Sequence, residues 1–397
     1  MELKQIDKIY LKLLFLVEAG IVVTQTLSLD TLTSAFFILT FPLTVLIWLG
    51  ACRRTFSGTD LMVVVASALA AVGVLLNAAI TSAQVDFASL KKLIMFIMAL
   101  LFFVAAYRIR IDEEMSTYIR KIVDALVLIL IVMYFLRREQ MYMLNGRYTT
   151  YLTFNFSNPN MTALFLSCLY MLKMNRLFED GVWYVKLFHI LQQVLLAWFL
   201  LETQSRNGML VLAMYTVFTV WLVFKSKRNL RITKFWAVLF AVFPAVMVVG
   251  YMLLIQDEWV INLLSFLVGE GKKLDSRVDV WGEALQYLGK SPLLGAYYEI
   301  SDGTGARHMH NSHLDIAASY GLPVLVMVCV LLVRCLHQQG RVYKNKKEYI
   351  YILGFACSVL LGVGEAAVFS GGLGLYIMAG ASLLLANKQD GTLPKAV

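Results

Sequence analysis

The stretch from Leu61 to Thr81, LMVVVASALAAVGVLLNAAIT, contains no charged side chain and is long enough to cross a membrane as one helix. An apolar run of about 20 residues spans the hydrocarbon core. Inside lipid every backbone amide and carbonyl must be paired internally, which a helix achieves and an open strand does not. Hydrophobic residues make up 59% of the 397 positions and charged residues 15%, against about 25% in soluble domains. The sequence therefore predicts an all-α, polytopic integral membrane protein and excludes a soluble globular domain.

Comparable apolar runs recur along the chain, without the alternation that a transmembrane barrel requires. They predict about twelve transmembrane helices. The expected spans are roughly 9–29, 32–52, 61–81, 90–107, 118–136, 160–174, 182–202, 207–224, 234–255, 314–335, 349–367 and 368–386.

The spacing of these spans divides the chain into three parts. Residues 1–255 would carry helices 1–9 with short loops, residues 256–313 a large extracytoplasmic loop, and residues 314–397 helices 10–12 and a cytoplasmic tail. Most of the basic residues then fall in cytoplasmic segments, as the positive-inside rule requires. The net charge of +9 is thus a topology signal that places both termini in the cytoplasm and needs no nucleic-acid partner.

Basic residues on the opposite side run against that rule. They occur in the loop 137–159, in the short turn 203–206 and in the loop 256–313. Cations there are either lipid-headgroup contacts or candidates for binding an anionic ligand. Arg206 favours the second interpretation because it stands alone in a very short turn between two apolar spans.

The large outer loop contains one predicted helix. Ser276 and Asp279 fit a capping pattern, apolar residues including Trp281 recur at helical spacing, and Pro292 follows the expected end. Such a helix would lie along the membrane surface or close over a cavity. Arg277, in its first turn, could then approach an anion held below.

The segment His308–His313, HMHNSH, is the densest reactive cluster in the sequence. Imidazole titrates near neutral pH and can serve as a general base. The same residues could bind a metal, although no established zinc spacing supports it, or simply cap a helix start. Polar residues inside the spans, namely Glu18, Asn77, His189, Gln192 and Gln193, are most simply contacts between helices.

Four short motifs resemble the O-antigen polymerase and O-antigen ligase superfamily of bacterial envelope glycosyltransferases. His310-Asn311 is followed nine residues later by Gly321, although Val324 stands where a second family glycine is usual. The turn Thr203–Arg206 is similar to the family's Ser-Arg turn. The other two are Arg277 with Trp281 in the outer loop, and Asn158-Pro159-Asn160 following Arg147.

The resemblance implies a GT-C-like fold and a metal-independent transfer without nucleotide or other cofactor, consistent with the missing phosphate-loop and dinucleotide motifs. The donor would be a glycan on undecaprenyl diphosphate, and the acceptor a sugar hydroxyl of a lipid-linked glycan. Arg206 and Arg277 would bind the diphosphate, since guanidinium pairs with phosphate through two hydrogen bonds. The implied base is His310, with His313 second. The further implied substrate-binding residues are Arg147, Asn158, Asn160, Ser205, Trp281 and Asn311.

The leading hypothesis is a repeat-unit polymerase for capsule, exopolysaccharide or O-antigen, in the bacterial cytoplasmic (inner) membrane with its active site facing outward. Membrane lipids, a flippase and a chain-length regulator are the candidate partners. An O-antigen ligase, which moves the finished glycan to lipid A core or another surface acceptor, shares the same motifs. Two further hypotheses, from different functional classes, are a lipid-linked glycan transporter and a non-catalytic envelope scaffold. An internal repeat would favour the transporter hypothesis, and none is detected in the sequence.

Overall fold

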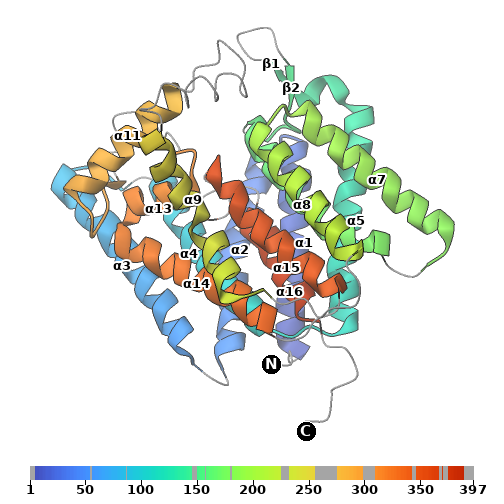
Figure 1. Ribbon diagram of the computed structural model, residues 1–397, viewed down its shortest axis with the longest axis horizontal. Coiled ribbons are helices and arrows are strands. Elements are labelled where there is room, and N and C mark those ends of the chain that lie inside the picture. The colour runs from blue at the N-terminus through green and yellow to red at the C-terminus, as the bar shows by residue number, and fades with distance from the viewer. Residues whose placement is uncertain are drawn as a thin grey trace.

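The computed structural model describes residues 5–53, 56–85, 87–144, 150–156, 158–178, 181–224, 232–254, 275–297, 309–341, 346–365, 369 and 374–388. In these residues the chain is a bundle of long helices with one short two-stranded sheet (Figure 1). Six described helices are long and apolar enough to cross a membrane. The chain is therefore an all-α membrane protein, as the composition predicts.

The helices follow the apolar runs of the sequence. The helices of 12 or more residues are α1 (Gln5–Thr26), α2 (Asp30–Cys52), α3 (Gly58–Thr81), α4 (Phe87–Arg108), α5 (Glu113–Leu136), α6 (Pro159–Met174), α7 (Trp183–Glu202), α8 (Arg206–Phe224), α9 (Lys234–Leu254), α11 (Asp275–Lys290), α14 (Leu322–Arg341), α15 (Lys346–Leu360) and α16 (Leu375–Ala386). The short elements are α13 (Ser312–Tyr320), the 3-10 helices η1 (Arg138–Met141), η2 (Asn175–Phe178) and η3 (Leu361–Val363), and the strands β1 (Tyr142–Leu144) and β2 (Thr150–Leu152).

The tenth predicted span, 314–335, is wrong as one continuous helix. The structure divides it at Gly321 into α13 and α14. Gly321 has a φ of +91°, and a Cβ at this position would collide with the backbone carbonyl of Leu293. Only glycine satisfies both conditions without strain. The segment 292–294 crosses the chain at Gly321. Pro292 O accepts a hydrogen bond there from the backbone N–H of Leu322, at 2.8 Å.

The last two predicted spans are shorter than expected. Helix α15 ends at Leu360 and continues only as η3, while α16 begins at Leu375. Both are apolar but have fewer than 18 residues. A count of twelve membrane crossings therefore remains a prediction.

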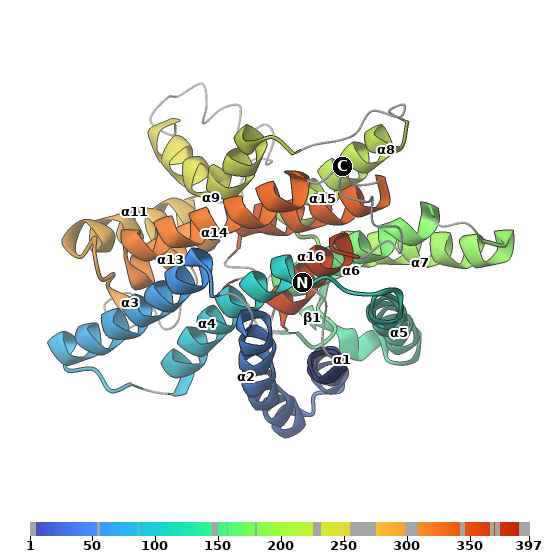
Figure 2. The ribbon, with the colours of Figure 1, turned by 90° about the horizontal axis from the view of Figure 1, so that it is seen from below.

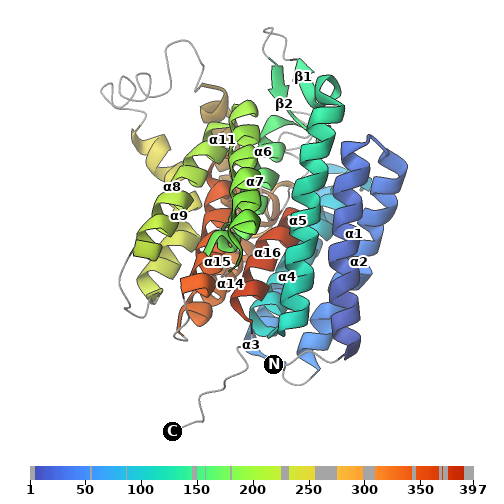
Figure 3. The same ribbon diagram turned by 90° about the vertical axis from the view of Figure 1, so that its right-hand side faces the viewer.

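The two ends of the bundle differ in what they hold. The first described residue of α1 and the last residue of α16 lie at one end, here called the terminal end (Figures 1 and 3). The other, called the hairpin end, carries β1, β2 and α11. Seen from below, α4, α6 and α16 lie toward the centre, between α1 and α2 on one side and α8 and α9 on the other (Figure 2). Every residue of α16 is buried, so this short helix forms part of the core.

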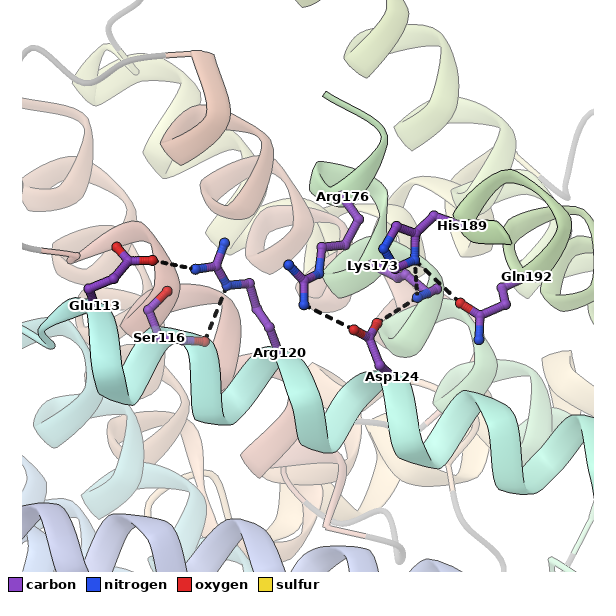
Figure 4. Close-up of polar contacts among 8 residues, drawn as sticks. All are labelled: Glu113, Ser116, Arg120, Asp124, Lys173, Arg176, His189 and Gln192. Atoms are coloured by element: carbon purple, nitrogen blue, oxygen red, sulfur yellow. Dashed lines mark hydrogen bonds and ion pairs between the residues drawn. The ribbon is translucent and has the colours of Figure 1, made fainter. Parts of the chain in front are cut away.

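Polar residues tie the helices together near the terminal end. Lys173 of α6 is fully buried, and its Nζ lies 2.5 Å from Asp124 Oδ1 of α5 and 3.0 Å from His189 Nδ1 of α7. Arg176 binds the second oxygen of Asp124 at 2.9 Å, and Gln192 lies 3.4 Å from His189 (Figure 4). The interhelical role predicted for His189 is therefore confirmed, and Gln193 likewise donates to Tyr170 O of α6 at 3.1 Å, whereas this contact of Gln192 lies within α7. Buried charge here is paired, as it must be in an apolar interior.

The helix predicted in the large outer loop is present as α11. It begins at Asp275, so Ser276 lies inside the helix and is not its cap. Trp281 and Ala284 of α11 pack with Val248 of α9, with Met309 before α13 and with Leu314 within α13. This apolar contact seats α11 over the start of α13.

Candidate functional site

The start of α13 is fixed by Asn311, which is fully buried. Its Oδ1 caps the helix by accepting from the backbone N–H groups of His313 and Leu314, both at 3.0 Å. Its Nδ2 donates to Pro244 O of α9 at 2.9 Å and to Val363 O of η3 at 3.1 Å. All the polar atoms of this amide are thus used inside the protein. Asn311 joins three segments, and this geometry leaves it no atom free for a substrate.

His310, one residue earlier, points to Glu365. Its Nδ1 lies 3.1 and 3.2 Å from the two carboxylate oxygens. The Glu365 side chain is 7% exposed and that of His310 is 41% exposed. A carboxylate accepts, so it favours the tautomer with the proton on Nδ1 and leaves Nε2 with a lone pair. An exposed imidazole with an oriented, basic Nε2 is the arrangement that a general base requires.

Glu365 is itself held in place from two sides. Asn160, at the start of α6, donates from Nδ2 to Glu365 Oε1 at 2.5 Å. Ser312 Oγ donates to the backbone carbonyl of Glu365 at 3.0 Å. Asn160 and His310 were predicted from the sequence as site residues, and Glu365 was not. The available signal was a single carboxylate inside the apolar run 349–367, where an ionisable residue marks a functional site by default.

The amino end of α8 lies against the same turn. Asn207 Nδ2 donates to Leu361 O at 2.8 Å. A Cβ on Gly364 would come within 2.7 Å of Asn207 Cγ, so the close approach depends on glycine. Arg206 is the first residue of α8 and is exposed. The structure therefore brings Arg206 to the same region as His310 and Glu365, and Arg206 is exposed there.

The turn that precedes Arg206 is tightly built. Ser205 is buried, and its backbone N–H donates to Thr203 Oγ1 at 3.2 Å. Gln204 has a φ of +53°, a left-handed backbone conformation that residues other than glycine rarely adopt. The turn thus fixes where Arg206 emerges, and Ser205 contributes to that through its backbone.

His313 occupies a different environment from His310. It is 1% exposed, and its Nε2 donates to the backbone carbonyl of Ala241 in α9 at 2.7 Å. Pro244 lies within the same helix, and proline loosens the hydrogen-bonded backbone around it. The backbone carbonyls of Ala241 and Pro244 accept hydrogen bonds from His313 and from Asn311, the N-cap of α13. The geometry favours His310 over His313 as the base.

Two other predicted site residues have structural contacts. Trp281 is buried, and its Nε1 donates to Met309 O at 2.8 Å, which anchors the residue before His310. Asn158 is the N-cap of α6 and accepts from Met161 N at 2.8 Å. Arg277 lies in the first turn of α11, but its side chain is not among those described, and Arg147 lies outside the described residues.

Backbone strain gathers at the hairpin end. Six non-glycine residues in the described part of the chain have positive φ: Ser28, Ser82, Phe154, Asn155, Gln204 and His310. Each lies in a turn at this end of the bundle. Such conformations persist only where the surrounding structure enforces them, and they concentrate at functional sites. The strain at Gln204 and His310 coincides with the two turns that present Arg206 and the His310 imidazole.

The family model described as O-antigen ligase matches residues 193–329. This segment runs from α7 into α14 and includes Arg206, Arg277, Trp281 and the start of α13. The residues contributed by α6 and by the Glu365 turn lie outside it. No curated protein matches the chain. The resemblance to the O-antigen polymerase and ligase superfamily is thus supported by a family-model match at residues 193–329 of this chain.

Proposed function

We propose that this protein transfers a glycan from undecaprenyl diphosphate to a sugar hydroxyl on the outer face of the bacterial cytoplasmic membrane. The observation that carries the proposal is the His310–Glu365 pair, with the exposed Arg206 beside the turn that bears Glu365. An oriented base and an uncompensated cation at one end of a membrane bundle suit a hydroxyl nucleophile and a diphosphate leaving group. The hairpin end is then the outer end.

The transfer step uses the free nitrogen of His310. Nε2 accepts the proton of the acceptor hydroxyl while its oxygen forms a bond to the anomeric carbon of the donor. The bond between that carbon and the diphosphate oxygen breaks, and both electrons leave with the lipid diphosphate. Arg206, with Arg277 as the second proposed cation, stabilises the negative charge that develops there. Glu365 stabilises the imidazolium that forms, and the proton then passes to water.

Two uses of this chemistry are open. A polymerase would add repeat units to a lipid-linked acceptor, which is our leading proposal for capsule, exopolysaccharide or O-antigen assembly. A ligase would move a finished glycan to lipid A core or another surface acceptor, and the description of the matching family favours it. Both use the same base and the same cation.

One reconstitution separates them. The purified protein is placed in lipid vesicles with one undecaprenyl-diphosphate-linked repeat unit, and the products are resolved on a gel. A ladder of longer lipid-linked glycans supports the polymerase, whereas transfer only after adding a lipid A core acceptor supports the ligase. His310→Ala should abolish either product, and His337→Ala, which changes a histidine of α14 outside the site, should not. Absence of transfer with every matched donor and acceptor would contradict the proposal and favour a transporter.

A further inference from the structure

The hairpin end carries a second polar and aromatic cluster that the proposed transfer step does not use. Tyr142, the first residue of β1, donates from its hydroxyl to Glu202 Oε2 at the end of α7, at 3.0 Å. The hydroxyl of Tyr134 lies 3.3 Å from that of Tyr142. The guanidinium of Arg138 lies 5.6 Å from the centre of the Tyr134 ring. We call these four residues the hairpin cluster.

The cluster rests on a rigid base. Tyr134 packs on Phe199 with ring centres 4.6 Å apart, and Phe199 packs on Phe154 at 5.4 Å. Tyr142 pairs with Leu152 across the two strands. The phenol and the carboxylate are therefore presented by buried aromatic packing and a strand pair, and a ligand that met them would lose little freedom in the protein.

The cluster offers groups to a ligand. Tyr142 and Glu202 are half-buried, and Arg138 is exposed. Glu202 Oε1 has no hydrogen-bond partner among the described residues, so one carboxylate oxygen remains available. A carboxylate accepts from neighbouring hydroxyls, a phenol both donates and accepts, and a guanidinium donates several hydrogen bonds. Together with a partly exposed aromatic ring, this set suits a neutral polyhydroxylated ligand such as a sugar chain.

Its position connects it to the site. Glu202 directly precedes the turn that presents Arg206, and Gln204 within that turn donates to Thr150 O of β2 at 3.4 Å. From β2 the chain continues to Asn160, which contacts Glu365. The hairpin and the base are thus joined through a short run of packed chain. The hairpin also lies outside the segment that matches the family, while Arg206 and His310 lie inside it.

We infer that the hairpin cluster is a subsite for the acceptor glycan, which it holds while the acceptor hydroxyl reaches His310. This inference rests on the proposed function. It assigns Tyr142 and Glu202 to acceptor recognition and leaves the diphosphate of the donor to the arginines. Because the cluster makes no contact with the reacting atoms, its loss should weaken acceptor binding and spare the chemical step.

The test separates acceptor from donor. The probe is the oligosaccharide repeat unit released from its lipid by mild acid, which retains an acceptor hydroxyl but has no leaving group. In the first experiment the concentration of the released glycan is varied at saturating lipid-linked donor. In the second, the concentration of the donor is varied at saturating released glycan. Glu202→Gln and Tyr142→Leu should each raise the KM for the released glycan by about tenfold, the loss expected for hydrogen bonds to a charged group. The KM for the donor and the kcat at saturation should stay within about twofold.

The control is Tyr184→Leu, which removes an exposed tyrosine from the other end of α7 and should change neither KM. Unchanged acceptor KM in both cluster variants would show an ordinary aromatic belt at the membrane interface and overturn the inference, as would an equal rise in both KM values. Wild-type transfer to lipid-linked but not to released glycan would also overturn it, because the lipid would then hold the acceptor. Failure of wild-type protein to transfer at all would instead contradict the proposed function.

Discussion

The terminal end and the hairpin end of the bundle differ in the number of ion pairs between their described residues. Of the nine ion pairs between described residues, seven lie near the terminal end, and six of these seven join different segments of the chain. The other two, Lys92–Asp315 and His310–Glu365, lie at the hairpin end. Arg138 and Arg206 are exposed there without such a pair in the described structure. Most ion pairs of the described residues thus lie near the terminal end, although exposed cations without such a pair among the described residues occur there too, for example Arg53 and Arg110.

Backbone conformation follows the same division. The left-handed non-glycine residues of the described chain all lie at the hairpin end. A left-handed backbone at a non-glycine residue costs stability, so such strain persists where it serves a function. We therefore expect substitutions at the hairpin end to reduce transfer and those at the terminal end to reduce stability.

The largest effect is expected at His310. His310→Ala should lower the transfer rate by at least about a hundredfold, the scale of general-base catalysis. His310→Gly should lose as much activity yet be about 1 kcal/mol more stable than His310→Ala, because glycine accepts a φ of +47° and alanine does not. Transfer assays and thermal unfolding of both variants measure this. Equal stability would show that the left-handed backbone at His310 is not strained.

Glu365 should come next. Glu365→Gln leaves an oxygen that can still accept from His310 but removes the charge that stabilises the imidazolium, so kcat should fall by about ten- to a hundredfold. The KM for donor should change little, since the carboxylate is nearly buried and contacts His310 and Asn160. Asn160→Ala should have a smaller effect on kcat in the same direction. A rise in donor KM with unchanged kcat would place Glu365 in substrate binding instead.

The sequence predicts these residues unequally. The apolar runs locate most helices because the lipid requirement acts on each segment by itself. His310, Arg206 and Trp281 stand in recognisable short motifs. Glu365 does not, because its role exists only through residues 55 and 205 positions away, His310 and Asn160. Pairings at such separation follow from tertiary packing, which no local pattern records.

For some residues the structure differs from the prediction because their hydrogen bonds could not be foreseen from the sequence. Asn311 and Trp281 were expected to contact substrate. In the structure, the side chains of both donate hydrogen bonds to backbone carbonyls. The break at Gly321 was missed because Leu322–Val333 continues the apolar pattern without interruption. Its cause is the crossing of residues 292–294, a contact from another part of the chain.

A moderate effect is expected from the terminal end. Lys173→Met removes a fully buried ammonium and leaves Asp124 with Arg176 alone, so the free energy of unfolding should fall by about 2 kcal/mol. Transfer per folded molecule should stay unchanged, because Lys173 lies at the opposite end of α6 from Asn160, which contacts Glu365. Thermal unfolding in detergent and the reconstituted assay measure the two quantities. A specific loss of transfer with unchanged stability would break the division between the two ends.

The smallest effect on transfer and on stability should come from Gln204, whose left-handed backbone conformation fixes the position of Arg206 at the start of α8. Gln204→Gly removes the steric cost of this conformation, about 1 kcal/mol, and adds a similar cost in chain entropy, so stability should change by less than about 0.5 kcal/mol. Gln204→Val places a β-branched side chain at the same φ and should be clearly less stable. Transfer by Gln204→Gly should fall only a few-fold, because the turn keeps its Thr203 contact but holds Arg206 less rigidly. If both variants lost the same stability, the left-handed turn would be a consequence of packing around the Gln204 side chain, and strain would not distinguish the hairpin end.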